Sequence, residues 1–186
     1  MTNYPYESRF YQLGPRIAQP AYSQSYAVPT NEPESWRRLK VFALDPSVSR
    51  QHGATATVRI PFEEHLAAGP SGRMFKIDLT VAGNETAYTP LHIEDSAFLR
   101  TDGRQPDEAD SGFHAQMVYA IACLTYESFR NALGRHTPWA FNGDENGHAL
   151  PLTLYPFGIS GEANAYYSRN ERAIRFGFVK SDPGNL

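Results

Sequence analysis

The histidines are the first residues to test for chemistry, because two of them on one face of a helix can hold a zinc ion for hydrolysis. A helical zinc motif places two histidines four residues apart. The chain has six histidines, none of them four residues from another: His52, His65, His92, His114, His136 and His148. The single cysteine, Cys123, excludes a cysteine-based zinc site and an internal disulfide. We therefore predict no metal ligand in this chain.

Motifs for other kinds of catalysis are missing as well. Glu63–His65 has no second histidine nearby and is interpreted as the polar end of a strand. Gly158–Gly161 lacks the G-x-S-x-G spacing of a serine nucleophile, and Gly112 lacks the glycine-rich approach that cradles phosphate. His114 falls in the first turn of a predicted helix, where the dipole disfavours a cation, so a neutral structural histidine is expected. Cys123 lies in an apolar run and is expected to be a buried, unreactive thiol. No catalytic residue is predicted.

Composition and charge narrow the class of protein. The 186 residues are 41% hydrophobic and 20% charged, which is typical of a globular domain. The formal net charge is -3, and the densest basic segment, Arg37–Lys40, is interpreted as the solvated start of a strand. Nucleic acid is therefore not an expected partner. Because no signal peptide and no run of roughly 20 apolar residues are seen, we expect a soluble, cytoplasmic protein with no membrane partner.

The chain divides into an N-terminal arm, residues 1–34, and a single β-rich domain, residues 35–186. The arm is rich in Tyr, Pro, Gln and Ser and has no period of 2 or 3.6. It therefore shows no apolar face to offset an ordering cost of about 1–2 kcal/mol per residue, and we expect it to be flexible. The alternative is an arm laid on a partner surface, because tyrosines supply contact area together with a polar group.

An α+β fold is predicted for the domain, with a mostly antiparallel β-sheet packed with one long helix. Alternating apolar residues bounded by turn residues predict five strands. These are Leu39–Leu44, Ala54–Phe62, Met74–Val81, Ala87–Ile93 and Leu150–Tyr155. A C-terminal β-hairpin is predicted from Ala163–Ser168 and Ala173–Val179, around a turn at Arg169–Arg172.

The long helix is predicted over Asp107–Gly134. Asp110 or Ser111 can cap its N-terminus, and acidic residues ahead of it favour the positive end of the helix dipole. Gly134 stands where a left-handed C-cap belongs, and Pro138 prevents continuation. The apolar stripe is wide, so the helix is expected to be buried over much of its circumference.

The helix and the hairpin carry a resemblance to a known family. The helix contains Phe113–Ala120 (FHAQMVYA) and Thr125–Phe129 (TYESF), and the hairpin contains Asn164–Tyr167 (NAYY) followed by Ile174–Gly177 (IRFG). In this order, these segments resemble the first long helix and the hairpin of thermolysin-like zinc peptidases, the gluzincins. The resemblance covers residues 107–179 and implies a divergent bacterial branch of that family, with an insertion between helix and hairpin.

The resemblance implies a role for the hairpin. In the family it forms the upper rim of the active-site cleft, where an edge strand holds an extended peptide. By resemblance, the side-chain amide of Asn164 and the carbonyl of Ala165 would hold the substrate backbone. Tyr166 and Tyr167 would line the cleft. An extended peptide or protein segment is therefore the expected partner.

One departure from the family concerns activity. Thermolysin-like enzymes carry H-E-x-x-H on a helix after this hairpin, and this sequence has no such motif. We expect a catalytically incomplete N-terminal lobe, with no cofactor of its own, whose zinc would be bound by downstream residues absent here and whose partner would be the missing C-terminal lobe. The alternative is a stand-alone β-rich binding module without enzymatic activity. A small hydrolase with an unrecognised site is a third reading.

Overall fold

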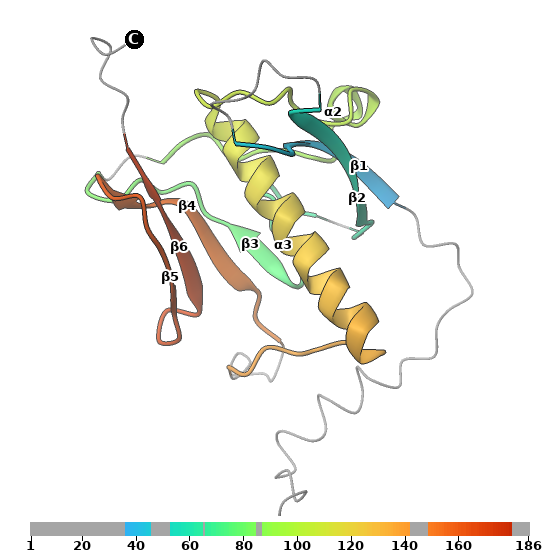
Figure 1. Ribbon diagram of the computed structural model, residues 1–186. Coiled ribbons are helices and arrows are strands. Elements are labelled where there is room, and N and C mark those ends of the chain that lie inside the picture. The colour runs from blue at the N-terminus through green and yellow to red at the C-terminus, as the bar shows by residue number, and fades with distance from the viewer. Residues whose placement is uncertain (1–35, 46–52, 65, 85–86, 142–148, 180–186) are drawn as a thin grey trace, which may run out of the picture.

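The computed structural model of the chain describes most of the β-rich domain (Figure 1). The described residues are 36–45, 53–64, 66–84, 87–141 and 149–179. The arm predicted over residues 1–34 lies outside them. Within them the fold is α+β, as expected, with one main helix, two sheets and a C-terminal hairpin.

The first sheet is a two-stranded antiparallel ribbon of β1 (Trp36–Phe42) and β2 (Thr55–Pro61). Alternate residues of the ribbon face inward, and Leu39, Val41 and Ile60 are buried there. Both strands were predicted, although β1 begins and ends earlier than the apolar run suggested. Its first inward-facing position is taken by an arginine, which an apolar pattern cannot reveal.

The long helix is α3 (Ser111–Leu133), and its two caps are those predicted. The side chain of Asp110 accepts a hydrogen bond from the backbone N–H of Gly112 at 2.8 Å, and Gly134 closes the helix with a φ of 65°. The predicted start at Asp107 was too early. That residue forms a separate turn, in which its side chain accepts from the N–H of Ala109.

The second sheet has four strands in the order β3-β4-β6-β5. Its strands are β3 (Phe75–Ile77), β4 (Leu152–Ser160), β5 (Ala165–Ser168) and β6 (Ala173–Phe178). The β5–β6 hairpin is antiparallel, but β4 runs parallel to both β3 and β6. The expectation of a mostly antiparallel sheet is therefore only partly borne out. The chain leaves β3, passes through α3 and enters β4 in the same direction, which makes a parallel crossover.

Other local predictions differ from the structure in detail. β4 begins at Leu152 and continues to Ser160, beyond the predicted Leu150–Tyr155. β3 is shorter than the predicted Met74–Val81, because Asp78 turns back to accept hydrogen bonds from the N–H and hydroxyl of Thr80 at 3.0 and 2.6 Å. Ala87–Ile93 forms no strand, and its β-pairing is limited to isolated bridges at Ala87 and Leu91. The short helix α2 (Ser96–Arg100) was not predicted.

The helix α3 lies between the two sheets, as Figure 1 shows, and packs against β1 and β2 on one side and β3 and β4 on the other. Ala115, Tyr119 and Ala120 are buried at this central position. The helix is therefore packed between the two sheets over its N-terminal half, where its buried residues lie between Gly112 and Ala120. The expected burial over much of its circumference does not extend to the C-terminal half, where Phe129 and Leu133 are exposed.

A buried polar side chain joins the helix to the ribbon. Gln116 is fully buried; its Nε2 donates to the carbonyl of Lys40 at 2.7 Å and to that of Arg104 at 3.1 Å. Its Oε1 accepts from the N–H of Arg104 at 2.7 Å. The amide is thus satisfied inside the protein, as burial requires. Gly103 makes room for it, since a Cβ there would lie 2.5 Å from Oε1.

Candidate functional site

The hairpin that carries the predicted site residues is shaped by its turn. Ser168 accepts a hydrogen bond from the N–H of Glu171 at 3.4 Å, and Arg172 donates its N–H to Arg169 at 3.3 Å. Arg172 adopts a φ of 54°, which closes the chain back into β6. These local contacts set the register in which Ser168 pairs with Ala173.

The other end of the hairpin depends on a glycine. The N–H of Gly177 donates to the carbonyl of Asn164 at 2.7 Å, and the N–H of Gly161 donates to that of Phe178 at 2.9 Å. A Cβ at Gly177 would overlap the carbonyl oxygen of Glu162. The segment that leads into β5 therefore lies directly on Gly177, and only glycine admits this close approach.

β5 is an outer strand of its sheet. In the part of the chain that the structure describes, it pairs with β6 on one side and with no strand on the other. Because Asn164 and Gly177 form a hydrogen-bonded pair, the antiparallel alternation directs the backbone groups of the next residue, Ala165, and of Tyr167 away from β6. The outer edge of β5 thus carries backbone groups that a further strand could pair with.

Asn164 modifies this edge at its first position. Its Oδ1 accepts the outward N–H of Ala165 at 2.8 Å. This contact fixes the side chain and leaves Nδ2 as a donor that no described residue accepts from. Along the edge, the accessible groups are then Nδ2 of Asn164, the carbonyl of Ala165, and the N–H and carbonyl of Tyr167. They provide donors and acceptors in the alternation that an extended backbone requires.

The side chains of β5 point alternately to the two faces of the sheet. Tyr167 pairs with Ile174 and Ala165 pairs with Phe176 on the face that α3 covers further along the sheet. Tyr166 pairs with Arg175 on the opposite face. The two tyrosines are 47% and 53% exposed, so both are available to a binding partner. The four predicted residues therefore lie together at one edge, with their side chains divided between its faces.

On the face of the sheet opposite α3, an aromatic ring and two charged side chains lie in a row. The guanidinium of Arg175 lies 4.4 Å from the ring centre of Tyr155, and its Nε donates to Glu171 at 2.8 Å. The hydrogen bond to Glu171 raises the pKa of Arg175. Burial raises the pKa of Tyr155, and the nearby Asp78 adds to the rise. Neither group exchanges a proton near neutral pH, so this row supports binding rather than acid–base catalysis.

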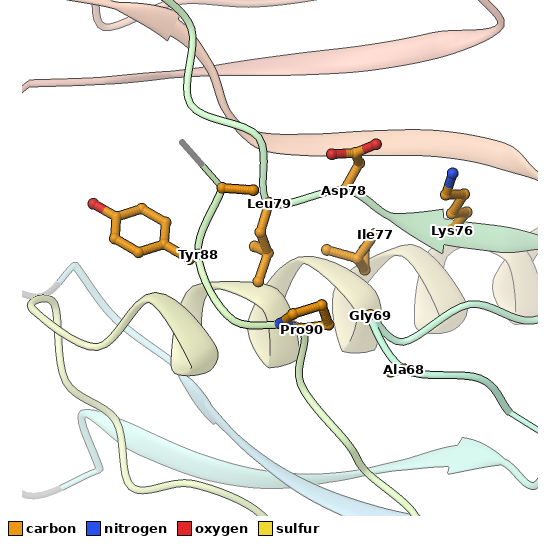
Figure 2. Close-up of a pocket in the computed structure, with 9 residues that line it drawn as sticks. Ala68, Gly69, Lys76, Ile77, Asp78, Leu79, Tyr88 and Pro90 are labelled. Carbon is orange, nitrogen blue, oxygen red and sulfur yellow. The ribbon is translucent and has the colours of Figure 1, made fainter. Parts of the chain in front are cut away.

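The other outer strand, β3, is covered. Pro70 accepts the N–H of Ile77, and Phe75 accepts the N–H of Gly72, both at 2.9 Å. A pocket of about 200 Å³ lies beyond this strand, where Figure 2 shows Ile77 and Leu79 with Tyr88 and Pro90 around it. In the same view Asp78 and Lys76 point toward the opposite side of the sheet from α3.

The polar side chains that line the pocket are either held by a neighbour or exposed. Its one carboxylate, Asp78, is already held by Thr80 through two hydrogen bonds. The remaining polar side chains are the amine of Lys76 and the phenol of Tyr88, and both are exposed. The open edge of the sheet is therefore the one at β5, and it is the stronger candidate site.

The residues that the sequence dismissed occupy structural positions. A ring nitrogen of His114 lies 2.7 Å from the carbonyl of Glu108, and its ring meets Phe157 edge-on at 5.4 Å. Glu63 accepts a hydrogen bond from the backbone N–H of Arg73. Burial raises the pKa of Cys123 to about 12, which agrees with the expected unreactive thiol. His65 lies outside the described residues.

One expectation about charge is wrong. The basic segment at the start of β1 is not wholly solvated, because Arg37 is buried, with its guanidinium 5.1 Å from the ring centre of Phe62. Arg37 forms an ion pair with Glu94, which compensates its charge. Burial raises the pKa of the neighbouring Tyr119 phenol. Arg37 and Tyr119 are enclosed in the core, whereas the side chain of Glu94 reaches the surface and is 39% exposed.

Comparison of the chain with protein-family models, with curated proteins and with solved structures found no match in any of the three. In the described ranges, no three His, Cys, Asp or Glu side chains gather closely enough to hold a metal ion. No helix among the described residues has the length and apolarity that crossing a bilayer requires. The case for function is therefore carried by the β5 edge.

Proposed function

We propose that the chain binds an extended peptide or protein segment along the outer edge of β5. The observation that carries this proposal is the row of outward hydrogen-bonding groups from Asn164 to Tyr167, with β6 pairing only on the inner side. A peptide added as the next strand would satisfy these groups and place its side chains alternately on the two faces of the sheet.

Asn164 supports this assignment because its orientation is fixed before binding. The hydrogen bond between Oδ1 and the N–H of Ala165 orders the side-chain amide, whose Nδ2 donates to no described residue. A donor that is already ordered costs less conformational entropy on binding than a mobile one. Two flanking tyrosines, Tyr166 and Tyr167, add amphipathic contact area on both faces.

The broader proposal is that the chain is the substrate-lining N-terminal lobe of a thermolysin-like zinc peptidase. It rests on the resemblance of Phe113–Phe129 and Asn164–Gly177 to that family and on the edge position of the hairpin. The chain contributes substrate binding and no step of hydrolysis. Zinc would be held by an H-E-x-x-H motif, which these 186 residues do not contain.

A further surface is suited to the proposed partner lobe. On the C-terminal half of α3, Ile121, Phe129 and Leu133 are 42%, 60% and 52% exposed, and they recur at multiples of four positions. This spacing places them along one side of the helix. An apolar stripe of this kind is suited to a contact with another protein surface.

The test is a titration of the ¹⁵N-labelled chain with a soluble extended probe, acetyl-Lys-Thr-Thr-Leu-Thr-Thr-Lys-amide, followed by NMR. We expect the amide signal of Tyr167 and the side-chain amide signals of Asn164 to shift together. A matched peptide with alternate backbone nitrogens methylated keeps its side chains but loses strand pairing, and it should not bind. Shifts confined to the pocket near Tyr88, or no shifts at all, would refute the proposal.

A further inference from the structure

The side chains along the proposed peptide edge differ in size, and the smallest is that of Ala165. On the face shared with α3, the edge strand presents only a methyl group at Ala165 and a full phenol ring at Tyr167. Both side chains are exposed. The residues that pair with them on β6, Phe176 and Ile174, are partly exposed. The row through Ala165 therefore has a gap at the edge, with an aromatic ring behind it.

We propose that Ala165 sets the side-chain selectivity of this edge, so that the peptide residue paired with it is a large apolar one. This inference rests on the proposed function. In an antiparallel or parallel pair, residues opposite each other place their side chains on the same face. The side chain of the peptide residue opposite Ala165 thus lies on the face of Phe176.

Strand spacing decides which side chains use the gap. Neighbouring strands lie about 4.8 Å apart, so the peptide backbone would be about 10 Å from the backbone of β6. A peptide alanine cannot span that separation. A leucine or phenylalanine leaning over the Ala165 methyl can reach the ring of Phe176 from the other side and bury apolar surface there.

The other positions along the edge offer no such gap. The phenol ring of Tyr167 stands between the peptide and Ile174 on the same face. On the opposite face, the ring of Tyr166 stands in front of Arg175, which is held by Glu171 and lies over Tyr155. Selectivity for a large side chain is therefore concentrated at the one position opposite Ala165.

The lack of charged side chains on the face of Ala165 also favours an apolar peptide side chain. The side chains that β5 and β6 place on it carry no charge: Ala165, Tyr167, Ile174, Phe176 and Phe178. Of the charged side chains of the hairpin, Arg175 lies on the other face and pairs with Glu171 of the turn, to which Arg169 and Arg172 also belong. A charged peptide side chain opposite Ala165 would lose hydration without gaining a partner. The position therefore also selects against aspartate and lysine.

The experiment varies one residue of the probe, acetyl-Lys-Thr-Thr-X-Thr-Thr-Lys-amide, with X as Ala, Leu, Phe or Asp. We expect Leu and Phe to bind about tenfold more tightly than Ala, and Asp to bind most weakly. NMR should show a nuclear Overhauser effect between the X side chain and the ring of Phe176. The Ala165→Leu variant fills the gap and should bind the Leu and Phe peptides no better than the Ala peptide. Ala165→Ser, which stays small, should keep the preference.

The outcomes separate the two proposals. If none of the peptides binds, the proposed function fails and this inference fails with it. If all of them bind at the edge with equal affinity, or if the preference survives in Ala165→Leu, the edge binds peptide but Ala165 does not set its selectivity. Because Ala165 is exposed, its variants are expected to fold, and an unchanged thermal unfolding midpoint checks this.

Discussion

Gln116 on α3 donates a hydrogen bond from its side-chain amide to the backbone carbonyl of Lys40 on β1, at 2.7 Å. The same amide also bonds both backbone groups of Arg104. One buried side chain thus fixes the distance between the central helix, the ribbon and the loop ahead of the helix. The four-stranded sheet rests on the other side of α3, so the geometry of the β5 edge depends on this helix being held in place.

Replacing Gln116 by leucine should therefore be strongly destabilising. The change leaves the part-buried carbonyl of Lys40 and the N–H and carbonyl of Arg104 without partners, which costs about 3 kcal/mol in total. Urea denaturation measures this loss in the free energy of unfolding. The exposed Gln105 provides the control, since Gln105→Leu should change stability by less than about 0.5 kcal/mol. Equal effects of the two changes would show that the buried network contributes little.

A second prediction separates two costs of replacing a glycine by alanine: the strain of a positive φ and the lack of space for a Cβ. Gly83 and Gly103 have φ angles of 76° and 87°, so alanine is strained at either position by about 1 kcal/mol. Gly83 has open space around it, whereas a Cβ at Gly103 would displace the buried amide of Gln116. Gly103→Ala should cost about 2 kcal/mol more than Gly83→Ala. Thermal unfolding of both variants checks the difference, and similar midpoints would contradict it.

The ion pair in the core should respond unequally to loss of either partner. Glu94→Ala leaves Arg37 buried with an uncompensated charge, and it should cost about 2–3 kcal/mol, since Glu94 itself is partly exposed. Arg37→Met removes the charge and two nitrogens, Nε and Nη1, that have no partner in the described residues, so its cost should be below about 1 kcal/mol. The measurement is the free energy of unfolding at low salt. The reverse order would mean that the guanidinium is a net stabiliser.

Cys123 should make the protein less stable at high pH. Burial raises the pKa of its thiol to about 12, above an ordinary value of 9.0. Between these two pH values the unfolded chain binds fewer protons than the folded one. The contribution of the thiol to the free energy of unfolding is therefore fully present below pH 9 and is lost as the pH rises toward 12. From pH 8 to pH 10 the loss should be about 1 kcal/mol.

The alanine variant identifies the source of this pH dependence. Cys123→Ala removes the thiol, and the loss of stability between pH 8 and pH 10 should shrink accordingly. Burial also raises the pKa of Tyr119, but its ordinary value is 10.0, so the phenol contributes mainly above that pH. An identical slope in the wild-type chain and the variant would assign the effect to another group.

The peptide edge yields one further prediction. Asn164→Ala removes the fixed Nδ2 donor and the contact to the N–H of Ala165, and it should weaken binding of the leucine-containing probe about tenfold. Asn131→Ala is the matched control, because Asn131 is exposed on α3 and away from the hairpin. Isothermal titration calorimetry measures both. A similar effect of the two changes would remove Asn164 from the site.

The features that were predicted correctly from the sequence are those that depend on residues close together in the chain. The caps of α3 at Asp110 and Gly134 and the β5–β6 hairpin follow from residues within a few positions of one another. The parallel pairing of β4 was missed, because the direction of a strand depends on where the chain returns from, and alternation carries no direction. A strand pattern likewise does not tell an inward arginine from an outward one, so the burial of Arg37 was also missed.

The candidate site could be predicted only in part from the sequence. Asn164, Ala165, Tyr166 and Tyr167 were named through a resemblance. In the structure Asn164 directly precedes the outer strand β5, and the other three residues lie on it. That β5 lies at the edge is a property of the strand order, which follows from long-range pairing. The requirement for Gly177 came from its contact with Glu162, which no local pattern contains.

The strand order also affects the order in which the parts of the β5 edge form during folding. The β5–β6 hairpin joins residues close in the chain, so it can form within microseconds, whereas β3 and β4 pair Phe75 with Leu152 across the whole of α3. Closing that long loop is the entropically demanding step. The hairpin would therefore be assembled before it is anchored. Until β6 docks on β4, both sides of the hairpin are unpaired, and a nascent or unfolded chain is more prone to strand-mediated aggregation than the native one.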